Sequence, residues 1–265
     1  MTKEWGPVFR AEDWVKYVAK REKVSEVSLG ETLVVTPIGS INSSLVEFFN
    51  AKPWVNWIYK PDSLWGVKAA DIFGHRVSFM TISPGAPQIS IVEETIVAGV
   101  KRVIFIGLAG GLGVEVGDLV VPYGAICEDG FSQHYIPYGV PIEASRKLHE
   151  YMLKACTELG CRVYSGRVWT TSAPYRELKW KAEEYYEKWE CRAVEMEAGA
   201  VYALGTYYGI ERAALLVISD LVYPVHEFGF HEEKLKETVN KIPLILKRFF
   251  FYCFKEEMRQ TESQS

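Results

Sequence analysis

Short apolar runs alternate with amphipathic segments along most of this chain, and this alternation limits the possible folds more than any other feature. Residues 32–36, 103–106 and 213–218 have the uninterrupted apolar character of buried strands, whereas 144–159 and 232–254 have helical spacing. A chain that alternates strands with helices builds a central sheet covered by helices on both faces. We therefore expect an α/β fold with a mixed, largely parallel central sheet.

The length and charge of the chain limit its domain organisation and its partners. With 265 residues, 48% of them hydrophobic, and no repeat or linker, residues 1–255 are expected to form a single domain, followed by a polar tail at 256–265. The net charge of −4 and the lack of a basic block argue against binding to nucleic acid. Lys247 and Arg248 interrupt the apolar stretch 244–254, which is also too short to span a membrane.

The cysteine pattern and the first residues of the chain suggest a cellular location. The 5 cysteines are scattered and form no Cys-x-x-Cys motif, as is typical of reduced thiols. Residues 1–7 contain no apolar signal-peptide core. We expect a cytoplasmic protein. His226 and His231 are spaced wrongly for a zinc helix and are separated by Gly229, so no metal site is expected.

Acidic residues occur at two places where ligands often bind. Glu195, Met196 and Glu197 precede a stretch of small residues, and Ser219 and Asp220 follow the apolar run 213–218. In open α/β sheets, ligands bind at the carboxyl ends of the strands. Two carboxylates and a thioether could therefore converge on one crevice. The alternative is an ordinary helix–strand unit with acids at its surface.

A glycine cluster follows the strand predicted at 103–106. It contains Gly107, Gly110 and Gly111, and leads through Gly117 and Asp118 into another strand. A dinucleotide fingerprint would have a different spacing and would open a helix, so that interpretation is rejected. Two interpretations stay open: the backbone approaches a small ligand closely, or the cluster forms a tight crossover in the sheet.

Together these blocks resemble the nucleoside phosphorylase family, which includes purine nucleoside phosphorylases, uridine phosphorylases and related nucleosidases. The resemblance rests on residues 194–204 and 216–220, on the glycine cluster with its Gly117-Asp118 strand, and on the Pro-Gly-Ala-Pro segment at 84–87. These segments follow the family order from about residue 33 to about residue 245. The resemblance implies a phosphorylase/hydrolase-like fold and cleavage of the N-ribosidic bond of a nucleoside.

The resemblance also implies roles for individual residues. Asp220 would be the catalytic group that donates to the departing base, and Glu197 would accept hydrogen bonds from the ribose hydroxyls. The form Ile-Ser-Asp at 218–220 favours a purine base. The remaining residues expected to bind substrate, which would line the sugar and base pocket, are Val194, Glu195, Met196, Ser219 and Tyr175.

The expected phosphate site departs from the family pattern. Phe105 stands where phosphorolytic members have an arginine, Leu108 stands where a serine or threonine is usual, and residues 39–44 contain no arginine. A buried phosphate without charge-assisted donors is costly. Phosphate would have to bind near a set of mostly uncharged positions, namely Gly39, Ser40, Phe105, Gly107 and Leu108.

Three functions remain open at this stage. Phosphorolysis to free base and ribose 1-phosphate, with inorganic phosphate as co-substrate and no cofactor, is favoured because no acid replaces the arginines at 37–46. The alternatives are a nucleosidase that uses water and a non-catalytic nucleoside-binding protein on the same fold. The tryptophan-rich segment 54–65 corresponds to a region near a subunit contact in the family, so a homo-oligomer, hexamer or dimer, is expected.

Overall fold

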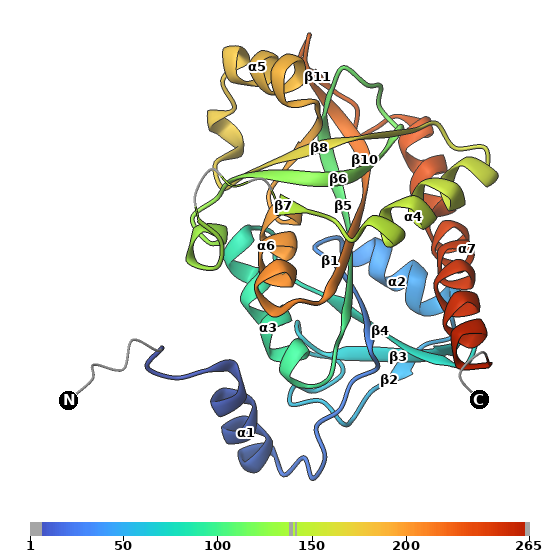
Figure 1. The fold of residues 1–265 in the computed structure, drawn as a ribbon. Helices are drawn as coiled ribbons and strands as arrows, with labels where there is room; N and C mark the ends of the chain where they lie inside the picture. Colours follow the sequence, from blue (N-terminus) through green and yellow to red (C-terminus); the bar gives the residue numbers. More distant parts are fainter. Residues whose placement is uncertain (1–6, 138–139, 141, 263–265) are drawn as a thin grey trace.

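The computed structural model describes residues 7–137, 140 and 142–262, and it has the predicted α/β architecture (Figure 1). Its helices are α1 (Ala11–Glu22), α2 (Gly39–Phe48), α3 (Ser90–Val97), α4 (Arg146–Glu158), α5 (Lys179–Trp189), α6 (Ala198–Tyr208) and α7 (Glu233–Glu262). Its strands are β1 (Thr32–Thr36), β2 (Lys52–Pro53), β3 (Val67–Ile72), β4 (His75–Thr81), β5 (Arg102–Leu112), β6 (Leu119–Glu128), β7 (Ile142–Glu143), β8 (Val163–Thr171), β9 (Cys191–Glu195), β10 (Glu211–Tyr223) and β11 (Glu227–Phe228). Short 3-10 turns are η1 (Ala86–Ile89), η2 (Ser132–His134) and η3 (Pro174–Arg176).

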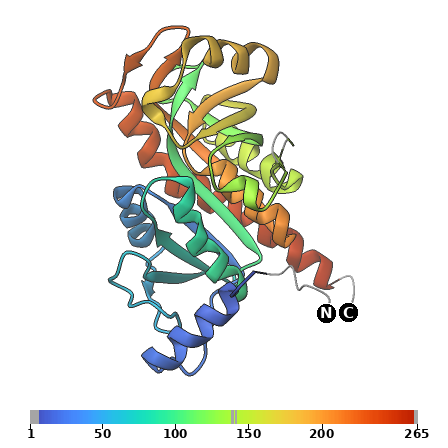
Figure 2. The same ribbon diagram turned by 90° about the vertical axis from the view of Figure 1, so that its left-hand side faces the viewer.

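Strand β5 joins two parts of one mixed sheet. The strand order is β11-β10-β6-β8-β9-β5-β1-β4-β3-β2, and β5 also pairs with β10. This additional pairing closes β5, β10, β6, β8 and β9 into a ring, and β1 to β4 continue from β5 as an open sheet. Figure 2 shows β5, in green, running from the open sheet below to the ring above. The mixed sheet was predicted from the sequence, whereas its closure into a ring was not.

The glycine cluster lies inside β5, not in a turn after it. Gly110 pairs with Val194 of β9 and with Asp220 of β10, so strands flank it on both edges. A Cβ atom at Gly110 would lie 2.6 Å from the side chain of Val222, and one at Gly111 would lie 2.9 Å from that of Ile218. The expectation that the strand would end at residue 106 was wrong. Small residues are needed here because neighbouring side chains cross over the backbone of β5.

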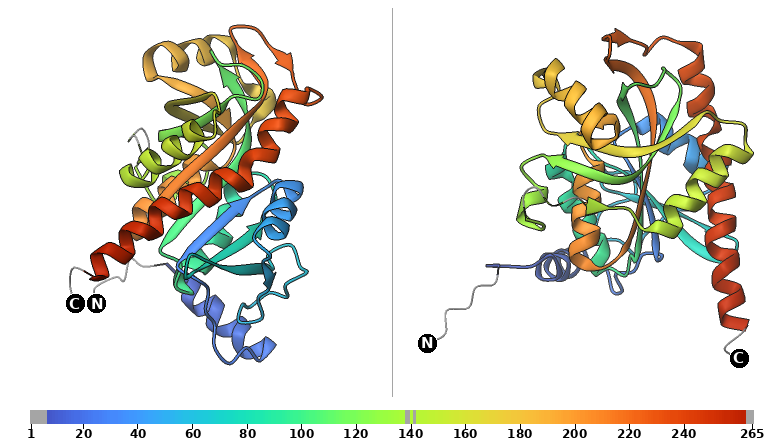
Figure 3. Two further views of the ribbon diagram at one scale, coloured as in Figure 1. Left: turned by 90° about the vertical axis from the view of Figure 1, so that its right-hand side faces the viewer. Right: turned by 45° about the horizontal axis from the view of Figure 1, so that its top comes forward.

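Two hydrophobic layers cover the sheet. One contains buried residues of α1, α3 and α6, and the other contains buried residues of α2, α4 and α7. Figure 1 shows α3 and α6 on one side and α2, α4 and α7 on the other, and Figure 3 shows α7 along the outside of β10. In β1, Leu33 and Val35 face the first layer and Val34 faces the second. This is the alternation expected of a strand that is buried on both faces.

Strand β9 was not anticipated from the sequence, although it delivers Glu195 to the candidate site. Arg192 interrupts its apolar pattern, and the strand forms by insertion between β8 and β5. Helix α7 continues to Glu262, through part of the segment expected to be a polar tail. No disulfide is assigned to the cysteines of the described residues, and the cytoplasmic location stays a prediction. Within the described part of the chain, no helix combines the length and the apolar character needed to cross a membrane.

Candidate active site at the split in the sheet

One edge of β5 changes its neighbour partway along the strand. Residues Arg102 to Phe105 pair with β1, and Gly110 and Gly111 pair with β9. In the described ladders, residues 106–109 pair with neither β1 nor β9, and we call this segment the β5 split. Because β9 runs antiparallel to β5, the chain that leaves β9 after Glu195 heads towards the split. A change of strand partner of this kind is where open α/β sheets bind ligands.

Glu197 lies beside the split and is almost completely buried, with 4% of its surface exposed. Its carboxylate accepts a hydrogen bond from the backbone N–H of Gly85, in the turn that follows β4. Gly85 has a φ of 107°, which a residue with a side chain rarely adopts. The Pro-Gly segment recognised in the sequence therefore meets the Glu-Met-Glu segment across the split, although the two residues are 112 positions apart.

Glu195 is also buried, but its carboxylate is occupied by the protein itself. One oxygen accepts hydrogen bonds from the N–H groups of Glu197 and Ala198, each at 2.7 Å. The other accepts a hydrogen bond from the Thr170 hydroxyl at 2.5 Å. Met196, between the two glutamates, is partly exposed. Met196 is therefore accessible to a ligand, whereas the Glu195 side chain is directed into the protein.

Burial raises the pKa of both glutamates. The nearby charge of Glu197 raises the pKa of Glu195 further, while the hydrogen bonds from Thr170 and the backbone oppose this effect. For Glu197, burial is the larger effect, and the hydrogen bond from Gly85 opposes it. Two carboxylates so close together titrate as a pair. Perturbed acids of this kind in a crevice are typical of functional sites.

Asp220 lies on the opposite edge of β5. The hydroxyl of Ser219 donates to Asp220 Oδ1 at 2.8 Å, and the other Asp220 oxygen lies 3.5 Å from the position that a Cβ atom of Gly110 would take. The Val194 side chain lies 3.1 Å from the same position. Val194 and Asp220 thus flank Gly110 on its two edges, with their Cα atoms about 10 Å apart across two strand spacings. Ser219 lies next to Asp220 and contacts its carboxylate.

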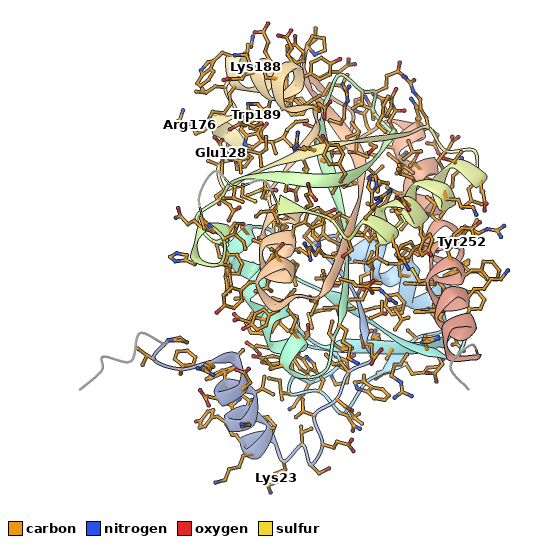
Figure 4. All side chains as sticks on the ribbon, viewed as in Figure 1. Lys23, Glu128, Arg176, Lys188, Trp189 and Tyr252 are labelled. Carbon is orange, nitrogen blue, oxygen red and sulfur yellow. The ribbon has the colours of Figure 1, made fainter. Side chains whose placement is uncertain are left out.

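Glu177 is a candidate site residue that the sequence did not reveal. It follows η3 and is partly buried; burial raises its pKa to about 7, and the charge of Asp220 adds to the effect. Tyr175, predicted to stack on the base, is 96% exposed, and its stacking role stays a prediction. Figure 4 shows the neighbouring Arg176 at the edge of the molecule near α5. The signal in the sequence that could have indicated Glu177 was its place two residues after Tyr175, which the resemblance puts in the base pocket.

The residues expected to hold phosphate are only partly brought together. Ser40 and Leu108 line one cavity of about 300 Å³ between α2 and α7, which we call the Ser40–Leu108 cavity. Phe105 is fully buried and its ring lies against Gly107, so its side chain belongs to the core. Gly39 begins α2. The cavity also includes apolar residues and one cation, and these remaining residues are Ile38, Ile41, Ser44, Leu235, Lys236, Val239 and Asn240.

Three larger cavities lie away from this site. One of about 420 Å³ lies between the η2 loop and α5, one of about 880 Å³ lies beside the start of α1, and one of about 560 Å³ lies at the starts of β1, β4 and β5. None of the three is lined by a predicted site residue. The chemistry of the β5 split, not cavity size, therefore identifies the candidate site: a buried acceptor at Glu197, an acid at Asp220, and a weakly polar cavity at Leu108.

Comparison with known proteins identifies the family of this chain. Residues 65–250 match the model of the phosphorylase superfamily. A DeoD-type purine nucleoside phosphorylase of Streptococcus pneumoniae is 36% identical over 166 residues, which cover 61% of this chain and 70% of the relative. Its counterpart in Streptococcus gordonii is 33% identical over the same coverage.

A solved structure shows the same fold. Purine nucleoside phosphorylase from Toxoplasma gondii, in complex with immucillin-H, superposes with a TM-score of 0.71 at 21% identity, covering 85% of this chain and 91% of that one. The matched family region contains Gly85, the β5 split, Glu197 and Asp220. This chain belongs to the phosphorylase superfamily.

Proposed function

We propose that this protein cleaves the N-ribosidic bond of a purine nucleoside. The observation that carries the proposal is the buried carboxylate of Glu197 at the β5 split, with Asp220 on the opposite edge of the same strand. The streptococcal relatives are named purine nucleoside phosphorylases, which supports the substrate class.

The proposed roles follow from the chemistry of the reaction. Breaking a ribosyl C–N bond passes through an oxocarbenium-like sugar. The Glu197 carboxylate would accept hydrogen bonds from the ribose hydroxyls and stabilise the developing positive charge. Met196, the exposed member of its segment, would pack against the sugar. Asp220, oriented by the Ser219 hydroxyl, would donate to the departing base.

Phosphate is the proposed nucleophile. In the Ser40–Leu108 cavity, Ser40, Ser44, Lys236 and Asn240 are the polar members, and Lys236 also pairs with Glu233 at 3.2 Å. One lysine and two hydroxyls supply fewer charge-assisted donors than a bidentate arginine. We therefore propose weak phosphate binding. The apolar lining favours water as the second candidate nucleophile.

The products formed from a purine nucleoside across a phosphate series test this proposal. Ribose 1-phosphate that forms only at high phosphate concentration supports phosphorolysis at a weak site. Free ribose at a rate independent of phosphate supports hydrolysis. Nucleoside binding without cleavage would contradict the enzymatic proposal and leave a binding protein.

We further propose that the protein is a homo-oligomer, a hexamer or a dimer. The segment 54–65 gives less support than expected, because Trp57 is fully buried and donates to the Trp65 carbonyl at 2.9 Å. Large apolar side chains are instead exposed near the N-terminus, at Phe9, Trp14 and Tyr17. Contiguous exposed apolar residues often mark contact surfaces. Light scattering at micromolar concentration tests this, and a monomer would contradict it.

A further inference from the structure

The N-terminus of α6 is occupied from within the protein. A helix begins with N–H groups that have no partner inside the helix and that attract anions. Here the N–H groups of Glu197 and Ala198 donate to the carboxylate of Glu195, and the N–H of Gly199 donates to the Thr170 hydroxyl oxygen at 2.9 Å. No ligand is needed to satisfy these three groups.

Thr170 and Glu195 form one unit across two strands. They are paired residues of the parallel strands β8 and β9, and the Thr170 hydroxyl donates to Glu195. A Cβ atom at Gly199 would lie 2.6 Å from the Thr170 oxygen and 2.6 Å from the Cys127 sulfur. The start of α6 is thus packed directly onto β6 and β8, with no room for a larger residue.

This unit fixes Glu197 from its backbone side. Glu197 is the N-cap residue of α6, with φ −137° and ψ −36°, so it stands outside the helix. Its N–H is held by Glu195, and its carboxylate is held by Gly85 across the split. The direction of the carboxylate is therefore determined at both ends of the residue.

We propose that Glu195, held by Thr170, is a positioning residue that aims the Glu197 carboxylate at the ribose. This rests on the proposed function. Glu195 itself does not touch the substrate, because its oxygens are taken by Thr170, Glu197 and Ala198. Thr170 would therefore act on the sugar indirectly, through its hydrogen bond to Glu195 and the hydrogen bond between Glu195 and Glu197.

The same contact has an electrostatic consequence. Each partner of the Glu195 carboxylate among the described residues is a hydrogen-bond donor. The titratable groups that face it are Glu197, Cys127 of β6 and Tyr202 of α6, and among the described residues no cation forms an ion pair with it. The charge of Glu197 raises the pKa of Glu195, so the two carboxyl groups titrate as a pair.

The test combines three variants with ligand titrations. Thr170→Val removes the hydroxyl at constant shape, Thr170→Ser restores it, and Glu195→Gln keeps the shape but removes the charge. Thr170→Val is expected to weaken nucleoside affinity about tenfold because a buried N–H and a carboxylate lose their partner. Free-base affinity should change less than about twofold, and Thr170→Ser should recover most of the nucleoside affinity. Equal losses for nucleoside and base would overturn the proposal.

A measurement without substrate separates this inference from the proposed function. The carboxyl ¹³C resonance of Glu197, assigned by its loss in Glu197→Gln, is titrated in the wild-type protein and in Glu195→Gln. In the wild-type protein the Glu197 resonance should report the coupled titration of two carboxyl groups, whereas in Glu195→Gln it should follow a single ionisation, because the second carboxyl group is gone. An unchanged titration curve would overturn the positioning contact. If the wild-type protein cleaves no nucleoside, the proposed function fails and this titration alone decides the inference.

Discussion

The two ends of the candidate site are built in opposite ways. At the sugar end, Glu195 and Glu197 are buried and every described contact of their carboxylates is a hydrogen-bond donor. At the nucleophile end, the Ser40–Leu108 cavity is bordered by isoleucine, leucine and valine side chains, by two serines and an asparagine, and by a single charged residue, Lys236. Both ends border the same split in β5.

The difference indicates which end of the candidate site would determine the specificity of ligand binding. A buried carboxylate is tolerated only when donors compensate its lost hydration, so the sugar end is preorganised before any ligand arrives. The nucleophile end has no comparable framework and would have to bind a dianion with few charged donors. The proposed function therefore predicts tight recognition of the nucleoside and loose recognition of the nucleophile.

The largest expected effect comes from Asp220. Asp220→Asn keeps the contact with Ser219 but cannot donate an acidic proton, so cleavage at saturating substrate should fall at least about a hundredfold with nucleoside affinity nearly intact. Single-turnover rates and equilibrium titrations measure the two quantities. Asp71→Asn, on the exposed part of β3, is the matched control. Unchanged turnover in Asp220→Asn would remove this residue from the mechanism.

Glu197 should separate sugar binding from base binding. Glu197→Gln is expected to lower nucleoside affinity at least about tenfold, because a charged acceptor for the ribose hydroxyls is lost, with little effect on free base. Glu177→Gln provides the contrast, because Glu177 faces Asp220 and should mainly alter base affinity. Calorimetric titrations with nucleoside and with base test both variants. Parallel losses in Glu197→Gln would contradict the assignment.

The sugar end should also respond to pH. Because burial raises the pKa of Glu197 above its ordinary value of 4.5, the carboxylate becomes protonated well above that pH as the solution is acidified. Nucleoside KM should then rise as pH falls, by up to about tenfold per pH unit. Phosphate KM, governed by the other end, serves as the internal control after correction for phosphate ionisation. A nucleoside KM that is flat down to about pH 5 would refute this.

The smallest expected effect concerns the nucleophile end. Leu108→Ser adds a hydroxyl in the same cavity as Ser40 and should lower phosphate KM by about threefold to tenfold, the effect of one added hydrogen bond. Val239→Ser makes the same change on the α7 wall of the cavity and should have less effect. Initial rates across a phosphate series compare them. If neither variant responds, phosphate does not bind in this cavity.

The sequence predicted much of the scaffold. Strand β1 has the predicted bounds, α4 lies within a few residues of the predicted helix, and α7 begins close to its predicted start, because their periodicity is regular. The order of the Pro-Gly, glycine-rich, Glu-Met-Glu and Ser-Asp segments was sufficient to indicate the family, which the comparisons confirm. The residue roles stay predictions.

The parts that the sequence missed depend on contacts between distant segments. The glycine cluster was expected to follow the strand, either beside a ligand or in a tight crossover, but β9 and β10 pair with it on both edges and keep it within the strand. Glu177 was overlooked because only the folded chain brings it near Asp220. Thr170 looked like an ordinary strand residue until the pairing of β8 with β9 placed its hydroxyl against Glu195.

The sequence by itself determined which elements form and which chemical groups are present, because helical and strand periodicity and residue type are local properties. The tertiary structure decided which groups face one another. Glu195 and Glu197 are equivalent in the motif, yet one is turned inward to Thr170 and the other towards the split. That choice depends on strand pairing and burial, since only the folded chain brings together the hydrogen-bond donors that compensate a buried carboxylate for its lost hydration.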